Sequence, residues 1–422
     1  MTLSAKPTVV DLFAGCGGFS LGLERAGYET VFVNELHSAA LATFLGNRQG
    51  SGLEQAGRHC NDIRDLTRRP GELSALAARL RQEHGGVDLV VGGPPCQGFS
   101  GIGHRRSFSV AREEIPSNHL YHEMAAVIES LKPRAFVFEN VRGLLTARWT
   151  PNGEKGEIWH DVCETFARIG ATMGTGELAY EIRPALVRSK DYGVPQNRPR
   201  VLLVGLRSDV PFSFDDQTGV AAGLLPLGGE RPPDLADLLD DLAYADWEPG
   251  GAAKTYRVDP QNEWQQGLRT LRSGETLDAG GHLAEHDYAR HSERIIRKFT
   301  HMLANGGAIP DDQRTKKFAQ RVLPAHWDPD IGPTITATSL PDDYVHYSLP
   351  RIPTVREWAR LQTFPDWYRF AGRRTTGGRR RAGDPSAGNW ERDMPKYTQI
   401  GNAVPPLLGT SIGLHLREIL GK

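Results

Sequence analysis

The stretch TVVDLFAGCGGFSLGLERAGYETVFVNE, residues 8–35, is the strongest indication of the fold. It opens with an apolar run typical of a buried strand, passes through a glycine-rich turn, and continues with a helical pattern in residues 19–27. A second strand-like run follows in residues 29–35. Strand, turn, helix and strand in this order form a βαβ unit, which is typical of a parallel sheet.

The same alternation continues to about residue 206, with strand-like runs at 87–93, 134–140 and 200–206 and a helical pattern at 121–131. We therefore expect an α/β fold with a doubly wound, mostly parallel, Rossmann-like sheet in residues 1–206. Ligands of such sheets bind beyond the carboxyl ends of the strands. Three segments are expected at the edge of the sheet formed by these strand ends: FAGCGG (13–18), GGPPCQGFS (92–100) and ENVRG (139–143).

The regular pattern ends after residue 206. Residues 207–330 have no clear period and are expected to form a smaller, separate domain. Residues 331–394 are expected to contain the end of that domain and a return segment, and a C-terminal segment at 395–422 is expected to rejoin the first domain. In the return segment, TVREWARLQ has the pattern of an amphipathic helix with Thr354 as its N-cap. The chain closes with a predicted turn and a helix that begins near Pro405 and Pro406.

Charge is unevenly distributed although the net charge of the 422 residues is only −1. From Asp209 to Glu248 there are ten acidic residues and one arginine, which disfavours contact with phosphate. From Arg290 to Arg321 there are eight basic and three acidic residues. Six arginines and no acid follow between Arg369 and Arg381, partly in a Gly-rich insertion near 371–394. These basic regions fit a nucleic-acid surface and a solvated face about equally well.

Composition excludes several classes of protein. No apolar run reaches the length of a membrane span, and the N-terminal residues do not have the pattern of a signal peptide. The four cysteines are scattered without a CxxC pair, which disfavours a zinc site and a disulfide framework. We expect a cytoplasmic protein without a bound metal.

Single residues at the predicted site edge are ambiguous. Cys96 could be a small packing residue, and Glu35, Glu139, Arg198 and Arg200 could be ordinary surface charges. A thiol held in a rigid Pro-Pro turn at a strand end is nevertheless poorly placed for packing. Together these groups suit one chemistry, the methylation of cytosine at carbon 5.

The motifs DLFAGCGGFSLG, GGPPCQGFS, ENVRG, QNRPRV, VREWARLQTFPD and QIGNAVPP occur in this order between residues 11 and 406. The chain closely resembles the DNA (cytosine-5) methyltransferases of the bacterial and phage modification type. The resemblance covers all but about 207–330 and the arginine-rich insertion. It implies a methyltransferase sheet and, in residues 207–330, a target recognition domain.

The resemblance implies S-adenosylmethionine as cofactor and a flipped cytosine in duplex DNA as substrate. Cys96 would add to C6 of the base, Glu139 would bind N3 and the exocyclic amine, and Arg198 would brace the base and its carbonyl. Arg200 is also expected among the catalytic residues. The segment after Cys96 resembles a mobile catalytic loop that closes over DNA, and its expected contacts are Gln97, Ser100, Arg105 and Arg106. The expected cofactor residues are Phe13, Gly15, Gly17, Gly18, Glu35, Asp62, Ile63, Leu120, Asn402 and Val404.

Three other functions remain as alternatives. An RNA (cytosine-5) methyltransferase shares these motifs but has a much reduced insert, whereas more than a hundred residues separate QNRPR from VREWARLQ here. A catalytically inactive regulatory subunit would usually lack Cys96 or Glu139. A Rossmann-type oxidoreductase would require a GxGxxG turn, which is missing at residues 13–18. The resemblance further implies a monomer with a restriction endonuclease or other defence proteins as candidate partners.

Overall fold

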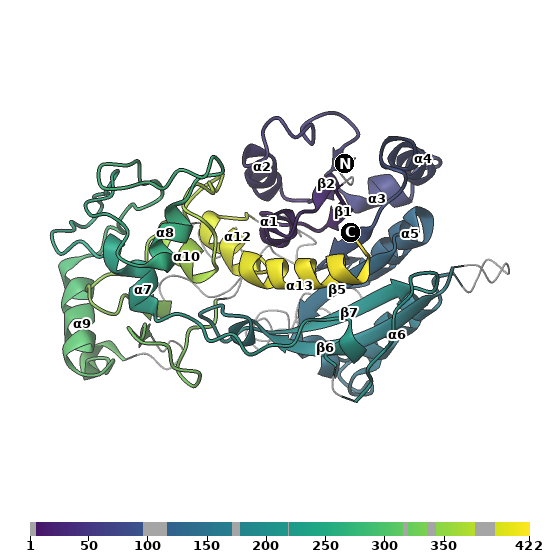
Figure 1. Cartoon of the computed structure of the whole chain (residues 1–422). Helices are drawn as coiled ribbons and strands as arrows, with labels where there is room; N and C mark the ends of the chain where they lie inside the picture. The colour runs from purple at the N-terminus through teal and green to yellow at the C-terminus, as the bar shows by residue number, and fades with distance from the viewer. Residues whose placement is uncertain are drawn as a thin grey trace.

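The computed structural model describes residues 6–95, 116–170, 178–217, 219–314, 320–335, 343–375 and 393–422. One half of the molecule is built around a sheet, and α7, α8 and α9 lie at the opposite end, with α12 between the two (Figure 1). None of the helices in these ranges is long and apolar enough to cross a membrane.

The large sheet has seven strands in the order β3-β2-β1-β4-β5-β7-β6. Strands β1 to β5 pair in parallel, whereas β7 is antiparallel to both β5 and β6. The bounds of the strands are Thr8–Leu12 (β1), Glu29–Asn34 (β2), His59–Cys60 (β3), Leu89–Gly92 (β4), Ala135–Val141 (β5), Tyr180–Arg188 (β6) and Pro199–Arg207 (β7). This topology confirms the predicted α/β, mostly parallel sheet.

Helices cover both faces of this sheet. Because successive side chains of a strand point to opposite faces, Phe136 and Phe138 of β5 join one core, and Ala135 and Val137 join the other. The first core is closed by α3 (Ile63–Thr67), α4 (Glu72–His84), α5 (Tyr121–Leu131) and α6 (Glu157–Ala167). The second is closed by α1 (Gly18–Arg25) and α13 (Pro406–Ile419). The α2 helix (Ser38–Gly46) packs beside the end of β2.

The second core also contains part of the region expected to form the smaller domain. Val210, Ala221, Leu224 and Leu225 are buried in it, against the sheet. At the other end, β8 (Arg321–Val322) pairs with β9 (Tyr344–Val345), so the pairing crosses the expected boundary at residue 330. We therefore define the second lobe as residues 235–352.

The second lobe contains α7 (Leu235–Leu239), α8 (Glu263–Arg269) and α9 (Glu293–Ala304). It packs on α10 (Val355–Leu361), which begins with the predicted N-cap Thr354. Thr354 and Glu357 form a reciprocal capping box, in which each side chain accepts a hydrogen bond from the other residue's backbone N–H. The chain then returns through α12 (Lys396–Asn402) to α13.

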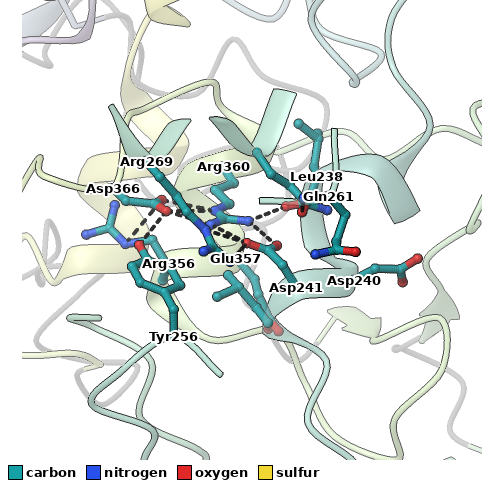
Figure 2. Close-up of polar contacts among 12 residues, drawn as sticks. Leu238, Asp240, Asp241, Tyr256, Gln261, Arg269, Arg356, Glu357, Arg360 and Asp366 are labelled. Carbon is teal, nitrogen blue, oxygen red and sulfur yellow. Dashed lines mark hydrogen bonds and ion pairs between the residues drawn. The ribbon is translucent and has the colours of Figure 1, made fainter. Parts of the chain in front are cut away.

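A buried ionic network joins the second lobe to α10 (Figure 2). Arg360 donates to Asp241 over 2.6 Å and to Asp366 over 2.6 Å. Arg269 donates to the second oxygen of Asp241 over 2.5 Å, and the Tyr256 hydroxyl donates to Asp366 over 2.7 Å. The two guanidinium and two carboxylate groups are almost completely buried, so removing one partner would leave an unpaired buried charge. The network therefore fixes the position of the second lobe on α10.

Two histidines beside this network are buried and neutral. The Nε2–H of His286 donates to Leu242 O over 3.1 Å, and its Nδ1 lies 2.9 Å from the Thr354 hydroxyl. Burial lowers the pKa of His286 to about 4 and that of His346 to about 3, although the Glu357 carboxylate partly opposes both shifts. Glu357 is itself held ionised by Arg351, over 2.6 Å.

We expect His346 to make the fold sensitive to acid. In the unfolded chain a histidine has a pKa near 6.5, whereas in the folded protein the pKa of His346 is about 3. Between these two pH values His346 is therefore protonated in the unfolded chain and neutral in the folded protein. The free energy of unfolding should therefore fall with decreasing pH, by about 1.4 kcal/mol per pH unit from this group. His346→Asn is a suitable variant because the amide oxygen can replace Nδ1 as the acceptor for Ser348 N–H. In this variant the free energy of unfolding should depend less on pH, by about 1.4 kcal/mol per pH unit. Urea unfolding of both proteins between pH 6.5 and 4.5 measures it, and parallel pH profiles would contradict the assignment.

Candidate active site

The candidate site lies at the carboxyl edge of the parallel strands. The segments after β1, β2, β4 and β5 meet there because these strands are neighbours in the sheet. Strand β7 runs in the opposite direction, so its first residues come to the same edge, and Arg200 pairs with Val141 at the end of β5. The topology thus brings the ENVRG and QNRPR motifs together, although about sixty residues separate them in the chain.

The loop after β1 is held open by Glu35. Gly15 N–H donates to Glu35 Oε2 over 2.9 Å, and His37 N–H donates to Oε1 over 2.7 Å. Phe13 and Gly15 both have positive φ angles, of 55° and 57°. A positive φ costs Phe13 conformational energy, and such strain is often found at functional sites. A Cβ atom added to Gly15 would meet no heavy atom within 4 Å, so there is open space beside the loop.

This edge fits a nucleoside-type cofactor. The Glu35 carboxylate accepts one backbone hydrogen bond on each oxygen, which leaves lone pairs for hydroxyl donors. Burial raises its pKa, whereas the two backbone donors lower it. Leu36, the next residue, is 56% exposed and could cover an apolar ring. Leu36 was not predicted from the sequence, where its only signal is an apolar residue directly after a strand-ending acid.

Two of the expected cofactor glycines are explained by packing. A Cβ atom on Gly17 would lie 2.7 Å from the Phe44 ring, and one on Gly18 would lie 2.3 Å from Val404 O. Gly18 therefore permits the start of α1 to approach the turn between α12 and α13. This contact also places Val404 beside the glycine-rich loop.

The other expected cofactor residues differ in their surroundings. Asp62 caps α3, accepting from Arg64 N over 3.0 Å, and is also paired with the Arg64 side chain. Ile63 is buried in the first core, Leu120 is half-buried before α5, and Asn402 is exposed. Asp62 and Ile63 follow β3 and so lie on the same edge as Glu35.

Glu139 and Arg200 form an ion pair at the end of β5. Arg200 Nε lies 2.7 Å from Glu139 Oε1, and both side chains are largely buried. A Cβ atom on Gly93 would lie 2.8 Å from the other carboxylate oxygen, so the Glu139 carboxylate packs directly on the GGPPC turn. Asn140 Nδ2 donates to Pro94 O over 3.0 Å and fixes the same turn. Cys96, Gln97, Ser100, Arg105 and Arg106 lie outside the described residues, and Cys96 is two positions beyond Pro94.

Arg198 has a different environment from Arg200. Its side chain is buried and donates to the carbonyls of Ile335, Gly401 and Asn402. Arg200 is thus held beside Glu139, whereas the guanidinium of Arg198 is held by backbone carbonyls of two other segments. Arg198 was the residue expected from the sequence to brace the base, but its guanidinium donates to backbone carbonyls instead. Both arginines belong to one QNRPR motif, which does not reveal this difference.

Comparison with known proteins supplies the family. The family model of C-5 cytosine-specific DNA methylases matches residues 7–418. The chain belongs to this family. It is 30% identical to the Type II methyltransferase M.DdeI of Desulfomicrobium norvegicum over 96% of this chain and 87% of that protein. It is 31% identical to M.XorII of Xanthomonas oryzae pv. oryzae, over 99% and 86% of the two chains.

The fold of this DNA cytosine-5 methyltransferase agrees with that of solved structures. A prophage-encoded E. coli protein named as a DNA modification methyltransferase superimposes with a TM-score of 0.64 at 21% identity, over 99% of this chain and all of the other. Membership of the family implies the use of S-adenosylmethionine and a DNA substrate. Within the described ranges, no group of three histidine, cysteine or acidic side chains is arranged to hold a metal ion.

Proposed function

We propose that this DNA cytosine-5 methyltransferase methylates a flipped cytosine in one specific duplex sequence, through a covalent bond between Cys96 and C6 of the base. The observation that carries the proposal is the Glu139–Arg200 pair, which packs against the turn that leads to Cys96. An open glycine-rich loop lies two strands away, at the end of β1. The turn that leads to Cys96, the Glu139–Arg200 pair and the glycine-rich loop thus share one sheet edge.

The chemistry assigns a role to each group. Carbon 5 of cytosine is a weak nucleophile, and addition of the Cys96 thiolate to C6 converts the ring into an enamine that reacts at C5. Glu139 would bind N3 and the exocyclic amine, and Arg200 would hold Glu139 and face the base carbonyl. When bound, the cofactor supplies the methyl group. Loss of the C5 proton and departure of the thiolate then restore the aromatic ring.

The other cysteines are poor candidates for the nucleophile. Burial raises the pKa of Cys16 to about 12, and that of Cys60 and of Cys163 to about 11. Each is therefore almost entirely a thiol at neutral pH, whereas nucleophilic attack requires the thiolate.

Cofactor binding is proposed for the loop and strand ends around Glu35. Glu35 would accept from ribose hydroxyls, Gly15 leaves room for the cofactor, and Leu36 would cover the adenine. The remaining proposed contacts are Phe13, Gly17, Gly18, Asp62, Ile63, Leu120, Asn402 and Val404.

A base inside the duplex cannot reach a site at the end of a sheet. Extrusion of the nucleotide costs a few kcal/mol, which contacts with the DNA must offset. We place these contacts in the segment from Gln97 to Arg106 and in the second lobe. The Type II relatives further suggest that the enzyme is the modification partner of a restriction endonuclease.

Product analysis tests the proposed reaction. Purified protein is incubated with S-adenosylmethionine carrying a labelled methyl group, and with either duplex DNA or tRNA. Enzymatic digestion should then show labelled 5-methyldeoxycytidine from DNA and no labelled nucleoside from RNA. Label in RNA would favour the tRNA-modifying alternative, and label on the exocyclic nitrogen would contradict the C6 adduct.

Sequence choice is expected to reside in the second lobe. Replacing residues 235–352 by the corresponding segment of M.DdeI should change the methylated sequence, whereas replacing 210–225, which packs on the sheet, should not. Methylation patterns of plasmid DNA from cells expressing each chimera measure the result. An active 235–352 chimera that keeps the original target would contradict this assignment.

Gly93 is expected to be essential for the rate of methylation. In Gly93→Ala the new Cβ would displace the Glu139 carboxylate, which lies 2.8 Å from it. A misplacement of about 1 Å can lower the rate by about 100-fold, so we expect kcat to fall on that order with little change in melting temperature. Gly46→Ala is the control, because its Cβ would meet no atom within 4 Å. Equal kcat values for the two variants would show that Glu139 is not held by this contact.

A further inference from the structure

Arg198 connects three parts of the chain. It precedes β7, which carries Arg200. Its Nη1 donates to Gly401 O over 2.7 Å and to Ile335 O, and its Nη2 donates to Asn402 O over 3.0 Å. The side chain is only 1% exposed.

The carbonyls around Arg198 explain how a buried cation is stabilised there. Gly401 and Asn402 are the last two residues of α12, and carbonyls at a helix C-terminus lack partners within the helix and carry partial negative charge. No carboxylate in the described ranges forms an ion pair with Arg198, and the carbonyls at the end of α12 accept its hydrogen bonds instead. Arg198 thus acts as a C-terminal cap supplied by another part of the chain.

Each end of this connection leads to a binding site. On one side, Asn402 precedes the turn whose Val404 O packs against Gly18 of the cofactor loop. On the other side, Ile335 belongs to the second lobe. Its neighbour Thr334 donates from the backbone to the Tyr344 hydroxyl over 3.0 Å, and Ile335 packs in the core that contains α10. Arg198 therefore provides a hydrogen-bonded connection between Ile335 of the second lobe and the turn beside the cofactor loop, in addition to the apolar core that contains both Ile335 and Cys16.

We propose that Arg198 is a positioning residue that couples binding of the cofactor to binding of DNA. This inference rests on the proposed function, in which the second lobe binds DNA and the loop after β1 binds S-adenosylmethionine. Coupling between two sites is reciprocal, so DNA should tighten cofactor binding by the same factor as the cofactor tightens DNA binding. With Arg198 removed, each site can still bind, but the factor by which one ligand tightens binding of the other should fall.

Binding measurements without turnover test the coupling. The affinity for S-adenosylhomocysteine is measured by calorimetry with and without target duplex, in the wild type, Arg198→Met and Arg198→Lys. We expect the duplex to tighten binding between about 5-fold and 150-fold in the wild type, and less than about 2-fold in Arg198→Met. Arg198→Lys, which keeps the charge with fewer fixed donors, should be intermediate.

The matched control is Arg134→Met. Arg134 also donates to a carbonyl at a helix end, that of Leu420 after α13, over 2.7 Å. Among the described residues its ion-pair partner is Asp88, which lies outside the second lobe. It should keep the wild-type coupling factor. If Arg198→Met does not fold, the coupling factor of Arg198→Lys tests the inference instead.

A wild-type coupling factor in a folded Arg198 variant, or no coupling in the wild type, would overturn the inference. Loss of coupling in Arg134→Met as well would also overturn it, by showing that general destabilisation is the cause. The proposed function fails separately, if the wild type does not methylate DNA at all.

Discussion

Replacing Cys96 by alanine should reduce methyl transfer to duplex DNA by roughly 10⁴-fold or more, because the enamine cannot form without a nucleophile at C6. Affinity for S-adenosylhomocysteine should change little, since the proposed cofactor contacts lie around Glu35 and not at the thiol. Rates under single-turnover conditions and calorimetric affinities measure the two quantities.

A duplex with 5-fluorocytosine at the target gives a more specific test of the adduct. After methyl transfer, C5 of the fluorinated base carries no proton to lose, so the bond between sulfur and C6 persists and the protein remains attached to DNA. Wild type and Cys163→Ala should form this complex, whereas Cys96→Ala should not. Cys163 is a suitable control because it is a half-buried thiol on α6 whose pKa is raised to about 11. A stable complex with Cys96→Ala would show that another group is the nucleophile.

Replacing Glu139 by glutamine should have the second-largest effect. The carboxylate is proposed to bind N3 as charge develops on the ring, so its contribution is greatest in the transition state. We expect kcat to fall by about 100-fold to 10,000-fold, with less than about a 10-fold change in affinity for the target duplex.

The control for this variant is Glu123→Gln. Glu123 is also a largely buried carboxylate paired with an arginine, Arg68, but it lies on α5 and outside the candidate site. A loss of activity common to both variants would indicate that buried ion pairs matter for folding in general. Equal losses in kcat and in DNA affinity for Glu139→Gln would indicate a structural role for Glu139.

Much of the sheet could be predicted because its strands are continuous apolar runs between glycine-rich turns. Strands β1, β2, β4, β5 and β7, and helices α1, α5, α10 and α13, all lie where the pattern predicts them. Strand β6 was not predicted. Its sequence YEIRPALVR has little alternation and contains Pro184, which an edge strand tolerates because one side of its backbone is unpaired.

The polar contacts between the second lobe and α10 could not be predicted. The pattern of TVREWARLQ indicates an amphipathic helix with a solvated polar face, but every residue of α10 is buried. The reason is that two aspartates neutralise Arg360. Asp241 is distant in sequence, and Asp366 lies beyond the end of the helix. Asp241 belongs to the acidic stretch after residue 209, so part of that negative charge is internal and never faces the surface.

The candidate site could likewise be predicted only in part from the sequence. The motifs predict which strand ends meet, and the topology confirms that they do. The different surroundings of Arg198 and Arg200 depend on the backbone of α12 and of the second lobe, which no local pattern reveals. The cofactor roles of Gly15 and Glu35, and the roles of Cys96 and its loop, stay predictions.

Bisulfite sequencing of plasmid DNA most directly tests whether this chain methylates cytosine at carbon 5 in a specific duplex sequence. The wild type and Cys96→Ala are expressed in a host that has no cytosine methylation of its own. With the wild type we expect protected cytosines at one fixed position in every copy of one short sequence, and with the variant we expect none. A folded wild-type protein that leaves every cytosine unprotected, or equal protection by Cys96→Ala, would contradict this expectation.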